Sequence, residues 1–343
     1  MTYKRNNKRF SVKGRGTYLT KADFIMTYYA DLEACKCFFF DMKWPTGYYC
    51  EKCGCTHHYY MKGKGSYRCC ECHHDERLLS NTCFQDCKLP LNKLLYGIFL
   101  IYADKRSISS LELTEELNVN YKTACLLQTK CRLLMRSSNT KQMLDSSFYE
   151  SDVVYIGAKS EGKQGMGTDK QAFLVILSTH KEHEYPMYVK LIEIEKDSGA
   201  NIEAQFSKNV KMSKDRILNT DGKTTFNILK SNLQVKNDKI NYQENESKLY
   251  FLNKIASNFK STIQGIYHGI GKRMIPLYFS EFEWRFNHRH TKDFMGKICK
   301  YIRNSTIMTR KDIVTARIYI LSIEVWNFLR DVKWALTLNN KRL

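Results

Sequence analysis

The sequence predicts an α/β protein in which a small cysteine-rich module precedes a larger mixed domain. Residues 150–295 alternate between strand-like and helix-like hydrophobic patterns, while ten of the 13 cysteines lie between Cys35 and Cys87. The length of 343 residues fits about two domains at roughly 150 residues each. Hydrophobic residues make up 43% of the chain and aromatic residues 13%, which is enough for packed cores and excludes a wholly disordered protein.

The net charge predicts a polyanionic partner. The chain has 55 Lys and Arg against 35 Asp and Glu, a formal charge of +20, which favours nucleic acid over an anionic membrane surface. The longest uncharged apolar run, Leu94 to Ala103, is too short to span a bilayer, and no apolar stretch follows the basic N-terminus to form a secretory signal. We therefore expect an intracellular protein with no membrane partner, in a bacterial cytoplasm or a eukaryotic nucleus.

Two Cys-x-x-Cys pairs predict a structural zinc site. Cys50 and Cys53 are separated by 15 residues from Cys69 and Cys72, a spacing typical of four thiolates on one tetrahedral ion. Residues 59–68 between the pairs suit a β-hairpin, as in a zinc ribbon. Four thiolates leave no open coordination position, which argues against hydrolysis at this metal. Other residues nearby remain alternative ligands: Cys55, Cys70, His57, His58, His73 and His74.

The next segment predicts a helix, a short turn and a second helix. An apolar helix is expected over residues 91–105, and Leu111, Leu113 and Leu117 precede Asn120, a favourable N-cap for a helix that starts at Tyr121. In a helix-turn-helix the start of the second helix reaches base edges in the major groove, which would place Lys122 at DNA. An ordinary helical hairpin fits this segment equally well.

The remaining patterns place acidic residues at the ends of strands. A strand over residues 148–157 and apolar runs over 172–178 and 187–194 predict three adjacent antiparallel strands. A helix is expected within 200–212, and a short strand after it ends at Asp221. A second helix, over 247–262, carries Asn253 and Lys260 seven residues apart and hence on one side.

Two-metal phosphoryl transfer is the chemistry that would join these groups. Two hard divalent cations need shared carboxylates, here Asp152 and Asp221, and further oxygen ligands such as the Asn253 carbonyl. Lys260 would contact a phosphate. Spacing alone does not single out these acids among the others in the chain.

The motifs in their order resemble the ISXO-like insertion-sequence transposases of the DDE superfamily, to which the eukaryotic Merlin elements are related. The resemblance covers about residues 45–292. It implies an RNase H-like mixed sheet flanked by helices, preceded by a zinc ribbon and a helix-turn-helix module, and DNA strand cleavage and joining that depend on Mg²⁺ or Mn²⁺. The motifs are CxxC…YRCxxC (Cys50 to Cys72), KLPL (Lys88 to Leu91), YKTA (Tyr121 to Ala124), ESDxxYIG (Glu150 to Gly157), a glycine-rich loop (Gly162 to Gly167), NTDG (Asn219 to Gly222), LNKIASNFK (Leu252 to Lys260) and the stretch from Gly265 to Arg289.

The resemblance implies a role for each matching residue. Asp152 and Asp221 match the first two catalytic acids, and the third position holds Asn253 where the superfamily carries Glu, as in a subgroup with asparagine there. The site then has one negative charge fewer; Glu244 or Glu246 nearby is the alternative third ligand. Duplex DNA, comprising transposon ends and target, is the implied partner, and a homodimer or higher assembly is expected. Four further residues are candidates for phosphate contact or for a structural role: His268, Arg285, Asn287 and Arg289.

Three other functions remain open. A catalytically silent or domesticated copy would only bind DNA, a nuclease or resolvase would cut without joining, and a transcription factor would not need the acid-tipped strands.

The expected domain organisation has five parts. They are a basic arm (1–35), a zinc ribbon (36–88), a helix-turn-helix module (89–140), an RNase H-like catalytic domain (145–295) and a basic helical tail (296–343).

Overall fold

The chain forms two compact units, each described here by itself. The first comprises residues 1–104, 110–131 and 291–343, and the second comprises residues 105–109 and 132–290. The computed structural model describes residues 20–103, 107–156, 171–181, 184–237, 249–267, 274–291, 293–309 and 312–313.

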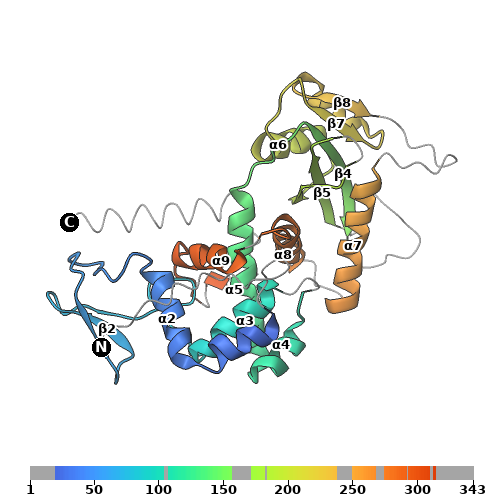
Figure 1. Ribbon diagram of the computed structural model, residues 1–343. Coiled ribbons are helices and arrows are strands. Elements are labelled where there is room, and N and C mark those ends of the chain that lie inside the picture. Colours follow the sequence, from blue (N-terminus) through green and yellow to red (C-terminus); the bar gives the residue numbers. More distant parts are fainter. Residues whose placement is uncertain are drawn as a thin grey trace. The chain divides into compact units, whose positions relative to one another are not determined.

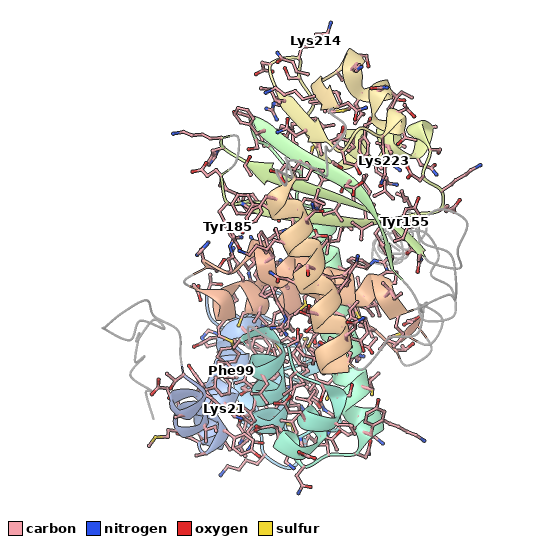
Figure 2. All side chains as sticks on the ribbon, turned by 90° about the vertical axis from the view of Figure 1, so that its right-hand side faces the viewer. Lys21, Phe99, Tyr155, Tyr185, Lys214 and Lys223 are labelled. Atoms are coloured by element: carbon pink, nitrogen blue, oxygen red, sulfur yellow. The ribbon has the colours of Figure 1, made fainter. Side chains whose placement is uncertain are left out.

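The first unit begins with helices that the sequence analysis did not anticipate. Thr20 forms a capping box with Asp23, and Asp31 caps the next helix by accepting from two backbone amides. The ring of Phe24 stacks on that of Phe99, which Figure 2 labels, with centroids 4.1 Å apart. The boundary expected between residues 35 and 36 therefore lies inside a helix. The elements are α1 (Lys21–Phe24), the π-helical η1 (Ile25–Tyr29) and α2 (Leu32–Lys43).

A small antiparallel sheet follows, as the cysteine spacing predicts. Its strands lie in the order β1-β2-β3, and the expected hairpin is confirmed. An aromatic cluster joins it to α2, because Tyr67 contacts both Phe40 and Trp44. The strands are β1 (His58–Met61), β2 (Ser66–Cys69) and β3 (Asp75–Glu76).

Three helices complete the module that the sequence predicts as helix-turn-helix. The side chain of Asn120 accepts from the Thr123 amide at 2.8 Å, which confirms the predicted N-cap. Gly97 allows close packing, since a Cβ there would lie 2.6 Å from Leu127 Cδ2 and 2.9 Å from Leu117 Cδ1. The helices are α3 (Leu91–Ala103), α4 (Ser110–Leu117) and α5 (Tyr121–Thr140).

Part of the expected C-terminal tail packs into the first unit. Helix α9 (Phe294–Arg303) contacts α2 and α3 through an apolar face that includes Ile298 and Ile302. Beyond it, the Ser305 hydroxyl accepts from the Cys83 amide at 2.8 Å. Because that face is buried, the helix is part of the core of the unit. The tail beyond residue 313 lies outside the described residues.

The second unit contains a five-stranded mixed sheet in the order β6-β5-β4-β7-β8. The three predicted strands are adjacent and antiparallel, while β7 runs parallel to β4 and β8 parallel to β7. This is the RNase H-like arrangement that the family resemblance implies. The strands are β4 (Phe148–Ile156), β5 (Gln171–Thr179), β6 (Tyr188–Ile194), β7 (Ile217–Thr220) and β8 (Gln234–Asn237).

Helices cover both faces of this sheet (Figure 1). Because side chains alternate along a strand, Leu174 packs with α6 and η2 on one face, while Val175 packs with α7 on the other. Helix α8 lies against β6. The elements are α6 (Gly199–Asn209), the 3₁₀ segment η2 (Thr224–Ser231), α7 (Tyr250–Tyr267) and α8 (Ile275–Asn287). Within the described residues, no helix has the length and apolar character needed to cross a membrane.

Candidate active site and zinc centre

The four predicted cysteines form one compact thiol cluster. Their sulfur atoms all lie within 4.8 Å of one another, and the Cys50–Cys72 and Cys53–Cys69 sulfurs are each 3.5 Å apart. Tetrahedral zinc with Zn–S bonds of about 2.3 Å requires sulfurs about 3.8 Å apart, so the cluster fits this ion. The tight turn after the first pair depends on Gly54, whose φ of +78° is unfavourable for other residues.

The alternative ligands do not join this cluster. Among the described residues, no other His, Cys, Asp or Glu lies close enough to join these four sulfurs around one ion. The Cys55 sulfur instead accepts from the His57 amide at 3.4 Å, and Cys70 is exposed. The thiol geometry therefore selects the two Cys-x-x-Cys pairs.

The two predicted aspartates lie side by side on neighbouring parallel strands. In the register of β4 and β7, Glu150 is opposite Asn219, so Asp152 and Asp221 fall at the same level two residues further along. Side chains two residues apart share a face of a sheet, so both carboxylates extend on one face. Asp221 directly follows β7, at the strand end where a ligand can approach.

Burial and neighbouring charges act together on Asp152. Burial raises the pKa of its carboxyl, the Lys223 ammonium lowers it, and the charge of Asp221 raises it again, with a net shift upward. Asp221 is thus near enough for its charge to act on the Asp152 carboxyl. Lys223 Nζ is 2.6 Å from Asp152 Oδ1, and the Asp152 side chain is 17% exposed.

The donor set fits a divalent cation such as Mg²⁺ or Mn²⁺. Asp221 Oδ1 is buried, and no hydrogen-bond partner for it occurs in the part of the chain that the structure describes. A buried carboxylate oxygen without a partner is costly unless a cation binds it. Carboxylate oxygens are the ligands that hard divalent cations prefer.

Helix α7 brings the predicted third residue to the same face of the sheet. The Leu252 backbone amide interacts with the Glu150 carboxyl, which lies two residues before Asp152 on the same face. Asn253 follows Leu252 in the first turn of α7 and is exposed. Lys260 is exposed two turns later, on the same side of the helix as Asn253.

Three of the candidate phosphate-binding residues contact the protein itself. Arg285 pairs with Glu281 at 2.8 Å, and the Asn287 amide both donates to and accepts from the backbone of Val189 on β6. Arg289 donates to the Pro186 and Met187 carbonyls. These contacts favour the structural alternative for the three residues.

The other candidate residues lie elsewhere. Lys122 is exposed in the first turn of α5, in the part of that helix that belongs to the first unit. His268, the glycine-rich loop at 162–167 and the alternative acids Glu244 and Glu246 lie outside the described residues.

Two residues at the site were missed by the sequence analysis. Lys223 follows the NTDG motif directly, and a cation two residues after a candidate metal ligand was a signal that could have been used. Glu150 was quoted only as part of a motif, although strand periodicity places it on the face of Asp152. Burial raises the pKa of its carboxyl to about 7, despite the opposing effect of the Leu252 amide.

Two family models match the chain at these regions. Residues 146–287 match the ISXO2-like transposase domain, and residues 31–75 match the transposase zinc-ribbon domain, together more than half of the sequence. The chain belongs to the ISXO2-like transposases. The matched domain contains β4 to α8. The matched ribbon extends from the N-cap residue of α2 to the first residue of β3. This transposase therefore carries both modules that its motifs indicate.

Comparisons with individual proteins add little to this assignment. No curated protein matches the chain. The pre-cleavage Mos1 transpososome is similar at 12% identity over 63% of this chain and 80% of that one, with a TM-score of 0.21. The Mos1 strand transfer complex is similar at 13% identity over 63% and 79%, with a TM-score of 0.23. These TM-scores are too low to carry a structural argument.

Proposed function

We propose that this transposase cleaves DNA at transposon ends and joins the freed 3′-hydroxyl to target DNA. One observation carries the proposal: the pairing of β4 with β7 puts Asp152 level with Asp221, which directly follows β7, on the face of the sheet covered by α7. Asn253 lies in the first turn of that helix and would provide a neutral oxygen donor. Two carboxylates and an amide oxygen on one face match the needs of in-line phosphoryl transfer.

Asp152, Asp221 and Asn253 would hold Mg²⁺ or Mn²⁺. Such ions, when bound, activate the attacking hydroxyl and stabilise the leaving oxygen. The protein orients the metal ligands. Strands β4 and β7 fix the two carboxylates relative to each other, and α7 aligns Asn253 and Lys260 along one side. Lys260 then contacts a DNA phosphate.

In this proposal the first unit binds DNA, and the excess of positive charge on the chain strengthens that binding. The ribbon, stabilised by structural zinc at the four cysteines, and the exposed start of α5 with Tyr121 and Lys122 would recognise the terminal inverted repeats. With a net charge of +20, phosphate contacts release counterions, so end binding weakens steeply as salt rises. We propose that the active form is a homodimer or higher assembly, because two ends must be handled together.

The test is a cleavage and joining assay with Mn²⁺ on duplexes carrying the inverted repeats that flank the gene. Asp152→Ala should lower cleavage by at least about a thousandfold, since the metal loses a shared ligand, while end binding in a gel shift stays within about twofold. Asp215→Asn, an exposed acid elsewhere in the second unit, is the matched control. If the Asp152→Ala variant cleaves DNA as fast as the wild type, the proposal is refuted.

A second candidate function is a catalytically silent copy that only binds DNA, and Asn253 favours it. Without the third carboxylate the site attracts divalent cations less strongly. Specific end binding with no cut product at any Mn²⁺ concentration would establish this function. Cut ends without joined products would instead indicate a nuclease or resolvase.

A further inference from the structure

Lys223 binds one of the two carboxylates of the proposed metal site. Its ammonium lies 2.6 Å from Asp152 Oδ1 and 3.1 Å from the Val153 carbonyl oxygen. Gly222 adopts a φ of +88°, and this turn directs the chain from Asp221 at the end of β7 back toward β4. Figure 2 shows Lys223 and Tyr155 of β4 at the same end of the sheet.

The position of this ammonium matters because it neutralises a carboxylate that a metal would use. Asp152 and Asp221 are close enough for the charge of one to act on the other, and Asn253 contributes no charge. Lys223 is therefore the cation that the structure shows bound to Asp152, beside Asp221. A divalent ion bound at Asp152 Oδ1 would lie beside a like charge, which is unfavourable in a partly buried site.

We propose that Lys223 is an internal counterion of the metal-free site and that a divalent cation must displace its ammonium to bind Asp152 and Asp221. This inference rests on the proposed two-metal function and deepens it by naming a residue that sets metal affinity. The Lys223 side chain is 30% exposed, and its flexible four-carbon stem allows the ammonium to leave without a change in the backbone. Lys223 is a positioning residue, since it acts through the two carboxylates.

The competition predicts tighter metal binding when the ammonium is removed. A partly exposed ion pair of this kind contributes about 1 kcal/mol, so Lys223→Met should lower the Kd for Mn²⁺ by about three- to tenfold. Lys223→Arg retains a cation and should bind Mn²⁺ like the wild type. In the metal-free state Lys223→Met should melt at a lower temperature than the wild type, because two carboxylates then face each other without a counterion.

The experiment is calorimetric titration of the zinc-loaded full chain with Mn²⁺. Lys214→Met is the matched control, since Lys214 is exposed before β7 and its substitution changes the net charge by the same amount. Asp152→Asn identifies the heat that belongs to this site. The rise in melting temperature caused by saturating Mn²⁺ is the second readout, and it should be larger for Lys223→Met than for the wild type.

The outcomes separate this inference from the proposed function. Tighter binding in Lys223→Met alone, with Lys223→Arg and Lys214→Met unchanged, supports the displacement. An unchanged or higher Kd in folded Lys223→Met overturns it, while binding that Asp152→Asn abolishes leaves the proposed function intact. If neither the wild type nor Lys223→Met binds Mn²⁺ in a way that depends on Asp152, both are wrong. If Lys223→Met does not fold, wild-type affinity in Lys223→Arg supports the inference, and tighter binding there overturns it.

Discussion

The thiol cluster and the proposed carboxylate site illustrate two ways in which one chain brings metal-binding side chains together. The four thiols come from a segment of 23 residues, Cys50 to Cys72, and lie within 4.8 Å of one another. The carboxylate site joins Asp152 and Asp221, which are 69 residues apart, through the parallel pairing of β4 and β7. Lys223 forms an ion pair with Asp152 there. A local site thus depends on its own loops, whereas a site assembled from distant strands depends on the whole unit.

Zinc removal should have the largest effect and should leave the carboxylate site unaffected. Four-thiolate zinc contributes about 10 kcal/mol or more to the folding of small modules, so stripping the metal or substituting Cys69→Ser should unfold the ribbon and abolish end binding. Mn²⁺ binding at the second unit should persist. The measurements are metal content, gel shift and Mn²⁺ titration of the same samples. Retained end binding in zinc-free protein would show that the ribbon does not need the ion.

Glu281→Gln should have the next largest effect and should act on the carboxylate site alone. Glu281 is 3% exposed and bonds Arg132 at 2.6 Å, so its loss leaves a buried guanidinium unpaired and should cost about 3–5 kcal/mol in the second unit. The mixed sheet and its Mn²⁺ site should melt earlier, while zinc stays bound. Thermal melts followed separately by zinc release and by Mn²⁺ binding measure this. If Glu281→Gln lowered the melting of the zinc site and of the Mn²⁺ site equally, the two sites would not be independent.

The ion pair of Glu281 with Arg132 also makes the stability of the second unit depend on pH. Burial alone would raise the pKa of Glu281, but the Arg132 and Arg285 guanidiniums outweigh it and hold the pKa at about 2. A carboxyl whose pKa is lower in the folded state stabilises the fold above its unfolded value of about 4.3, and this contribution disappears as the pH falls toward 2. The wild type should therefore lose more stability than Glu281→Gln between pH 5 and pH 3 by about 1–2 kcal/mol. Parallel denaturant titrations across this range would measure the difference.

Asn253→Glu should have the smallest effect. A third carboxylate adds a negative charge at the start of α7, so the Kd for Mn²⁺ should fall by about tenfold, equivalent to about 1.4 kcal/mol. Asn258→Glu, which adds the same single charge at an exposed position further along the same helix, is the control for charge alone. An unchanged Kd in Asn253→Glu would mean that residue 253 does not face the metal.

Local patterns were predictable, and contacts between distant segments were not. The two Cys-x-x-Cys pairs, the Asn120 cap and the three antiparallel strands followed from spacing and periodicity. The sequence also placed Asp221 at a strand end. It did not reveal that α9 completes the first unit, because an amphipathic helix carries no signal for what it packs against.

The site shows the same division. The motifs pointed to Asp152, but the ion pair with Lys223 depends on the turn at Gly222 and on the pairing of β4 with β7. The inward contacts of Asn287 likewise depend on the position of β6 beneath α8. The roles of Lys260 and Lys122 remain predictions.

Iron-directed cleavage of the backbone tests the convergence of the three residues most directly. Fe²⁺ replaces the divalent cation, and ascorbate with peroxide generates hydroxyl radicals that cut the chain only near the bound ion. The account predicts three cuts, near residues 152, 221 and 253, which all disappear in Asp152→Asn and are competed by Mn²⁺. Cuts at only one of these segments, or cuts that persist without Asp152, would contradict it.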